Sequence, residues 1–187
     1  STLLPYTTLF RSYKSASQRA IAFHYDAQRA IASHYDALVR EDNDPARDCG
    51  VLREYMDKWD GQPFLDALEL SPEADVLEIG VGTGRLALRV LKIGCRSITG
   101  VDISPLSLER AKENLSGHGS FEPVLSDISD FSSARKYDVI YSSLTFLHIE
   151  DKETAVLTAA SLLKDGGRLV LSLSRDKSTE LNYKIGR

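Results

Sequence analysis

The sequence lacks both a long apolar run and a set of cysteines. No hydrophobic stretch approaches the roughly 20 residues that a membrane-spanning helix needs, so we expect no membrane segment. Cys49 and Cys95 are the only cysteines, and they lie far apart and in no metal-ligand spacing. Two thiols are too few for the disulfide framework of a small secreted protein. We therefore expect a protein of the reducing cytoplasm with no metal site.

The sequence also lacks an excess of positive charge. It has 23 Lys and Arg residues against 27 Asp and Glu residues, which gives a net charge of −4. The basic residues are scattered, so they do not indicate the basic surface with which proteins attract phosphate backbones. We expect a small-molecule substrate and no nucleic-acid partner, whereas the oligomeric state has no signal in the sequence.

The first part of the chain does not resemble ordinary globular sequence. Residues 1–14 are expected to be non-native, because Thr2–Ser12 resembles the conceptual translation of a sequencing adapter. A tandem repeat follows, in which Gln18–Ala27 and Gln28–Ala37 differ at two positions only. A period of ten turns the second copy about 80° from the first on a helix, so the copies would not share one buried stripe. We interpret the repeat as a local duplication or an assembly error, with the second copy the better candidate for native sequence.

The rest of the chain predicts one α/β domain, because 187 residues suffice for a single core of ordinary size. Residues 15–70 form a helical lead-in, with helices expected at Ala30–Arg40, Cys49–Trp59 and Phe64–Leu70. In residues 71–187, short apolar strands alternate with amphipathic helices, a pattern typical of a doubly wound, mainly parallel sheet. The expected strands are Val76–Ile79, Ser97–Val101, Phe121–Leu125, Tyr137–Ser142 and Arg168–Leu173, and the expected helices are Gly84–Ile93, Pro105–Leu115 and Lys152–Leu163.

A glycine-rich loop joins the first strand to its helix, with Gly80, Gly82 and Gly84 at alternate positions. Glycines permit unusual backbone angles and let a ligand lie against the main chain, although a plain tight turn uses them equally. A dinucleotide site requires its third glycine where this sequence has Arg85, which we interpret as a solvated residue of the first helical turn. No Gly-Lys-Ser/Thr follows, so a phosphate-binding P-loop is also excluded.

Two aspartates end neighbouring strands, at the edge where open α/β sheets bind ligands. Asp102 and Ile103 follow the second strand, and Asp127 and Ile128 follow the third. A carboxylate there can accept hydrogen bonds from both hydroxyls of a ribose. The alternatives are a charge at a helix N-terminus for Asp102 and a turn aspartate for Asp127.

These features together resemble the class I S-adenosylmethionine-dependent methyltransferases, over about Tyr35 to Ser174. The resemblance rests on an acid two residues before G-x-G-x-G, on the two strand-end aspartates, and on the segments YDVIYSSLTFLHI and LKDGGRLVLS. It implies a Rossmann-like fold with S-adenosylmethionine as the methyl donor. The glycine loop would cradle the methionine part, Asp102 would bind the ribose, and Ile103, Asp127 and Ile128 would bind the adenine.

The resemblance also implies roles for Glu78 and Tyr35. Glu78 would reach the donor's ammonium, or would merely support the loop. Tyr35 resembles residues that cover the donor, although a buried helix aromatic explains it as well. The reaction needs no obligatory catalytic residue, because alignment alone can supply on the order of 7–11 kcal/mol. His148, after the fourth strand, is the candidate proton acceptor, with a structural histidine as the alternative.

The sequence departs from the family in two places. After the fourth strand it reads Ser142, Ser143, Leu144 instead of Asp/Asn-Pro-Pro-aromatic, which makes methylation of nucleobase amino groups unexpected. The family's sheet ends in an antiparallel hairpin, so we expect a carboxyl-terminal truncation. The predicted function is methyl transfer to a small-molecule oxygen, nitrogen or carbon. The alternatives are a non-catalytic domain that binds the cofactor or a partner, and a nicotinamide oxidoreductase, which Arg85 disfavours.

Overall fold

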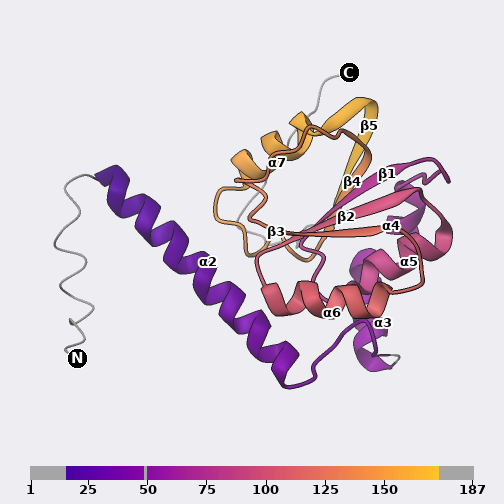
Figure 1. The fold of residues 1–187 in the computed structure, drawn as a ribbon, viewed down its shortest axis with the longest axis horizontal. Helices are drawn as coiled ribbons and strands as arrows, with labels where there is room; N and C mark the ends of the chain where they lie inside the picture. Colours follow the sequence, from indigo (N-terminus) through magenta and orange to yellow (C-terminus); the bar gives the residue numbers. More distant parts are fainter. Residues whose placement is uncertain (1–15, 49, 173–187) are drawn as a thin grey trace.

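The computed structural model of the protein describes residues 16–48 and 50–172 (Figure 1). The adapter-like segment, Cys49 and any hairpin after the fifth strand lie outside these residues. The elements in chain order are α2 (Ala16–Arg40), α3 (Val51–Asp60), α4 (Gln62–Ala67), β1 (Asp75–Ile79), α5 (Arg85–Ile93), β2 (Ser97–Asp102), α6 (Pro105–Leu115), β3 (Phe121–Leu125), β4 (Tyr137–Ser143), α7 (Lys152–Ser161) and β5 (Leu163–Ser172).

The five strands form one parallel sheet in the order β3-β2-β1-β4-β5, which confirms the predicted fold class. β1 lies at the centre, where Val76 pairs with Ile98 of β2 on one side and with Val139 of β4 on the other. All five residues of β1 are buried, as expected for a strand that is covered on both faces.

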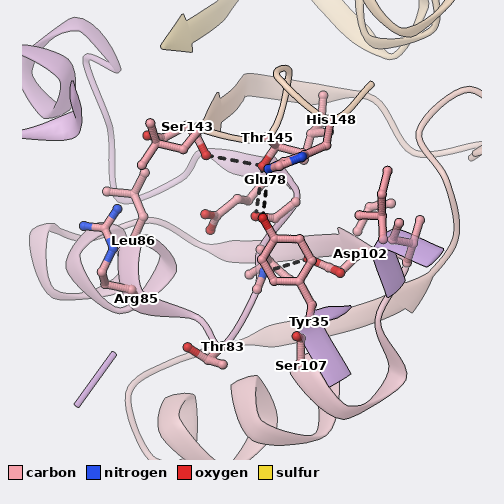
Figure 2. Close-up of a pocket in the computed structure, with 18 of the residues that line it drawn as sticks. Tyr35, Glu78, Thr83, Arg85, Leu86, Asp102, Ser107, Ser143, Thr145 and His148 are labelled. Atoms are coloured by element: carbon pink, nitrogen blue, oxygen red, sulfur yellow. Dashed lines mark hydrogen bonds between the residues drawn. The ribbon is translucent and has the colours of Figure 1, made fainter. Parts of the chain in front are cut away.

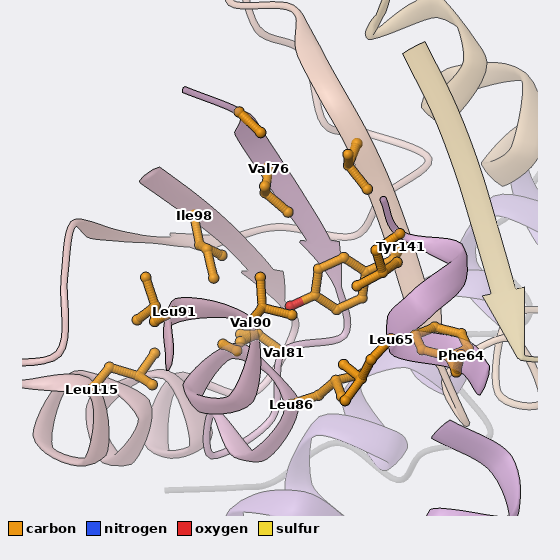
Figure 3. Close-up of a cluster of buried hydrophobic side chains, with 14 of the residues drawn as sticks. Phe64, Leu65, Val76, Val81, Leu86, Val90, Leu91, Ile98, Leu115 and Tyr141 are labelled. Carbon is orange, nitrogen blue, oxygen red and sulfur yellow. The ribbon is translucent and has the colours of Figure 1, made fainter. Parts of the chain in front are cut away.

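The sheet separates two hydrophobic clusters. One cluster packs the sheet residue Val76 against α4, α5 and α6, and Figure 3 shows this cluster. The other packs its neighbour Leu77 against α7. Connections between parallel strands are right-handed, so strands added to the left and to the right of β1 carry their helices on opposite faces. The chain therefore reverses direction between β1 and β4, and ligands bind at such a switch point beyond the carboxyl ends of the strands.

Helix α2 contains both copies of the repeat in one continuous helix, so the predicted start near its middle was too late. The copies are placed differently, as the period of ten predicts. Tyr25 of the first copy is 51% exposed, whereas the equivalent Tyr35 is half-buried. Asp36 of the second copy accepts hydrogen bonds from the Ser104 hydroxyl at 2.6 Å and the Leu106 N–H at 3.2 Å. The second copy thereby holds α2 against the N-terminus of α6. No helix among the described residues is long and apolar enough to cross a membrane.

The boundary between α7 and β5 differs most from the prediction. The strand begins at Leu163, five residues before the predicted start, and α7 ends two residues earlier than predicted. The reason is local pairing, because the Tyr137 N–H donates to the Leu162 carbonyl at 2.9 Å and Tyr137 pairs with Leu163. The register then shifts between Tyr137 and Val139, so the turn stays against β4.

Candidate functional site

A single cleft opens at the carboxyl ends of the strands, and nine of the ten predicted site residues line it. The exception is Gly84. The lining comes from α2, the glycine loop, the ends of β2 and β3, and the segment after β4. The space not filled by atoms in the cleft and its mouth is about 1260 Å³. Small-molecule sites usually measure about 300–1,000 Å³, so this cleft has room for two reactants.

The three glycines of the loop do different work. Gly82 has φ +54°, and no atom lies within 4 Å of the point where a Cβ would stand, so its main chain is open to the cleft. At Gly80, with φ +74°, a Cβ would overlap the side chain of Thr145. At Gly84, with φ +87°, a Cβ would stand 3.1 Å from Leu115 Cγ of α6. Gly82 therefore offers space to a ligand, whereas the other two allow close packing.

Asp102 connects the end of β2 to this loop. Its Oδ2 accepts the Gly82 N–H at 2.8 Å, and its Oδ1 accepts the Ser104 N–H at 2.9 Å. Burial raises the pKa of Asp102, and these N–H groups act in the opposite direction. A carboxylate oxygen has two lone pairs, so both oxygens can accept a further hydrogen bond. Asp102 thus fixes the open glycine and still presents acceptors to the cleft.

Asp127 is both a turn residue and a cleft residue, so the two interpretations of it are compatible. Its Oδ1 accepts the Ser129 N–H at 2.7 Å, which closes a turn after β3. Ile128 beside it is 3% exposed and belongs to the core, and its side of the cleft also includes Ile103. This end of the cleft combines carboxylate oxygens with apolar surface.

Glu78 lies at the floor of the cleft and is 3% exposed. It pairs with Tyr141 of β4 in the sheet, and the Tyr141 hydroxyl donates to Glu78 Oε2 at 2.7 Å. Burial raises the pKa of Glu78 to about 8, although the hydrogen bond from Tyr141 acts in the opposite direction. The carboxyl group is therefore mainly protonated at neutral pH in the free protein.

Tyr35 and His148 meet across the mouth of the cleft (Figure 2). The Tyr35 hydroxyl lies 2.9 Å from His148 Nε2, and the rings meet edge to face with centroids 5.7 Å apart. Burial raises the pKa of Tyr35, and the nearby charge of Asp102 raises it further. His148 itself is exposed. Nearby, Leu144 has φ +61°, an uncommon backbone conformation for a bulky residue and one that concentrates at functional sites.

Comparisons with known proteins now add the family. Residues 76–167 match the family model described as a methyltransferase domain. Over 105 residues the chain is 34% identical to a malonyl-acyl-carrier-protein O-methyltransferase of Ilyobacter polytropus, which covers 56% of this chain and 39% of that relative. Residues 76–167 are a class I methyltransferase domain. The methyl donor of this family is S-adenosylmethionine.

Solved structures of methyltransferases agree with this assignment. A methyltransferase of Thiobacillus denitrificans in complex with S-adenosyl-L-homocysteine is 25% identical, with a TM-score of 0.51 over 57% of this chain and 44% of that chain. The magnesium protoporphyrin IX methyltransferase of Synechocystis PCC 6803 is 19% identical, with a TM-score of 0.62 over 78% of this chain and 74% of that chain, and it supports the fold alone. The chain spans less than half the length of the first curated relatives that it matches.

One part of this methyltransferase site was missed by the sequence analysis, and the interpretation of Arg85 as a solvated residue was wrong. The Arg85 side chain is 14% exposed and forms an ion pair with Asp60, whose side chain is fully buried. Arg85 Nη1 donates to Asp60 Oδ1 at 3.0 Å, and the Ser143 hydroxyl donates to Asp60 Oδ2 at 2.6 Å. The network joins α3, α5 and β4 behind the glycine loop, and no sequence spacing signals a partner 25 residues away.

Proposed function

We propose that the chain transfers a methyl group from S-adenosylmethionine to a small-molecule acceptor. The observation that carries this proposal is the position of the open main chain at Gly82, which Asp102 holds by a hydrogen bond at 2.8 Å within the cleft. Asp127 lines the same cleft, so the loop and both strand-end acids share one binding space.

The residues present fit such a donor. The open backbone of Gly82 would accommodate the methionine part, and Asp102 would accept hydrogen bonds from the ribose hydroxyls. The adenine would lie near Asp127, with the apolar side chains of Ile103 and Ile128 beside it. Glu78 would face the ammonium, and Tyr35 on α2 would cover the donor. The bound donor would supply an electrophilic methyl group on its sulfonium.

The protein's own part in the chemistry is to align the reactants and exclude water, which can supply on the order of 7–11 kcal/mol. Helix α2 covers the cleft from one side, held by Asp36 at α6 and by Tyr35 at His148. His148 is within reach of the cleft and would accept a proton from the acceptor, directly or through a neighbouring group.

The remaining proposals concern the chain as a whole. We propose a cytoplasmic protein in which residues 1–14 are non-native, residues 15–70 form the helical lead-in and residues 71–187 form a methyltransferase core that continues in a longer native protein. The genomic sequence around this reading frame tests these boundaries, because it shows which of the two repeat copies and which terminal codons are native.

Replacing Gly82 by alanine is expected to weaken the binding of S-adenosylhomocysteine by about tenfold or more, because the new methyl group enters the ligand's space. Titration calorimetry measures the dissociation constant. Gly117→Ala is the matched control, since Gly117 also has positive φ and open space but lies outside the cleft. Equal loss of affinity in both variants, or no binding by the parent protein, would contradict the proposed site. A labelled-methyl assay on cell metabolites then separates transfer from binding alone.

The affinity for S-adenosylhomocysteine is expected to increase with pH up to about pH 8. Glu78 has a pKa of about 8 in the free protein, and an ammonium beside it favours the carboxylate form. A proton is then released on binding below that pH, so the dissociation constant falls by up to about tenfold per pH unit as the pH rises toward 8. Calorimetry in buffers of different ionisation enthalpy measures the released proton. Glu78→Gln should remove the effect, and a pH-independent constant for the parent protein would rule out this pairing.

A further inference from the structure

The part of the cleft opposite the strand-end acids is apolar. Its side chains come from α2, α3 and the segment after β4, and they are Ile31, Leu38, Val39, Met56, Leu144 and Ile149. The strand-end acids and the open glycine take up the other end of the space. An acceptor that binds beside the donor therefore contacts mainly hydrocarbon, which favours a molecule with a largely apolar surface.

The charges around the cleft disfavour an anionic acceptor. Among the described lining residues, Arg85 is the one positively charged side chain, and its guanidinium is already bound to both carboxylate oxygens of buried Asp60. Glu78, Asp102 and Asp127 also line the cleft, and their oxygens repel a carboxylate or phosphate. Removing an anion from water without a cationic partner is costly, so this space suits an uncharged acceptor.

Tyr35 supplies the polar group that such an acceptor needs. Its hydroxyl lies in the cleft and is 2.9 Å from His148 Nε2, and His148 is exposed to water. When the Tyr35 O–H donates to Nε2, the lone pairs of its oxygen remain available to accept a hydrogen bond from an acceptor hydroxyl. The pair therefore connects a half-buried acceptor of hydrogen bonds to solvent.

We propose, on the basis of the methyl transfer proposed above, that the acceptor is an uncharged, largely apolar hydroxyl compound, that Tyr35 binds its hydroxyl, and that His148 acts through Tyr35 as the exit for its proton. The acceptor oxygen bonds to the methyl carbon while the carbon–sulfur bond breaks and leaves its electron pair on sulfur. The hydroxyl proton passes to the Tyr35 oxygen, the Tyr35 proton passes to His148 Nε2, and the imidazolium returns one proton to water. A hydroxyl needs this path, whereas a neutral amine attacks with its lone pair.

The substrate class is tested by binding to the protein saturated with S-adenosylhomocysteine. The probes are 2-naphthol and 2-naphthoate, which share an apolar frame but differ in charge. We expect 2-naphthol to bind at least about tenfold more tightly. Equal or tighter binding of 2-naphthoate, or no binding of 2-naphthol, overturns the proposal. Failure of S-adenosylhomocysteine to bind would instead refute the proposed function, so the two failures are distinguishable.

The roles of Tyr35 and His148 are tested by two matched pairs of variants. Tyr35→Phe should weaken 2-naphthol binding by about five- to tenfold with unchanged affinity for S-adenosylhomocysteine, while Tyr25→Phe in the other repeat copy should change neither. His148→Gln keeps an acceptor for the Tyr35 O–H but cannot take up a proton. It should therefore remove the rise of 2-naphthol methylation with pH across the neutral range, and exposed His118→Gln should not. Unchanged binding in Tyr35→Phe, or an unchanged pH profile in His148→Gln, overturns the assignment.

Discussion

Asp60→Ala is expected to lower the free energy of unfolding by about 3–5 kcal/mol, because it leaves the largely buried guanidinium of Arg85 without its partner. The same change removes the acceptor of the Ser143 hydroxyl at 2.6 Å, which adds an unsatisfied group next to the cleft. Urea denaturation followed by circular dichroism measures the loss as a shift of the midpoint.

The chain contains a matched control for this prediction three residues earlier on the same helix. Asp57 pairs with Arg89 at 2.7 Å, but their side chains are 37% and 25% exposed. Exposed ion pairs contribute about 0–1 kcal/mol, so Asp57→Ala should change the free energy of unfolding by no more than that. An equal loss of stability in the two variants would show that the burial of the Asp60 ion pair adds nothing to its effect on folding.

Asp102→Ala is expected to raise the dissociation constant of S-adenosylmethionine by roughly ten- to a thousandfold. One or two hydrogen bonds to a charged group are lost, each worth roughly 1.5–3 kcal/mol, and 1.4 kcal/mol corresponds to about tenfold. The Gly82 N–H also loses its acceptor, so the open loop is held less firmly. Titration calorimetry on variants with native circular dichroism spectra measures the effect.

Asp130→Ala is the control for this second prediction, because Asp130 is exposed on a turn near the cleft but does not line it. Its dissociation constant should equal that of the parent protein. An unchanged constant for Asp102→Ala would remove Asp102 from the donor site, whatever the fold of the domain.

The sheet and its helices were predictable because their signals are local. β3 and α6 begin and end at the predicted residues. The start of α6 is defined by Ser104, whose hydroxyl accepts the Ser107 N–H at 3.0 Å, and by Pro105 in the first turn. The cleft was predictable for a related reason, since parallel strands place their carboxyl ends at one edge and so bring residues from the ends of β1, β2 and β3 together.

The features that escaped prediction depend on contacts between distant segments. Asp60 belongs to α3 of the lead-in, and only the packing of that helix against α5 brings it to Arg85. Similarly, the meeting of Tyr35 and His148 depends on how α2 docks, and the two residues are 113 positions apart. A single sequence without aligned relatives contains no signal for such pairs.

The central position of β1 also determines when this domain can assemble during synthesis. β1 pairs first with β2, but its other edge stays open until β4, residues 137–143, has left the ribosome. Thr145, which packs against Gly80 of the loop, emerges later still. Because long-range parallel pairing is slow and open strand edges are prone to aggregate, the nascent chain passes through a vulnerable interval that its nucleoside ligand cannot shorten.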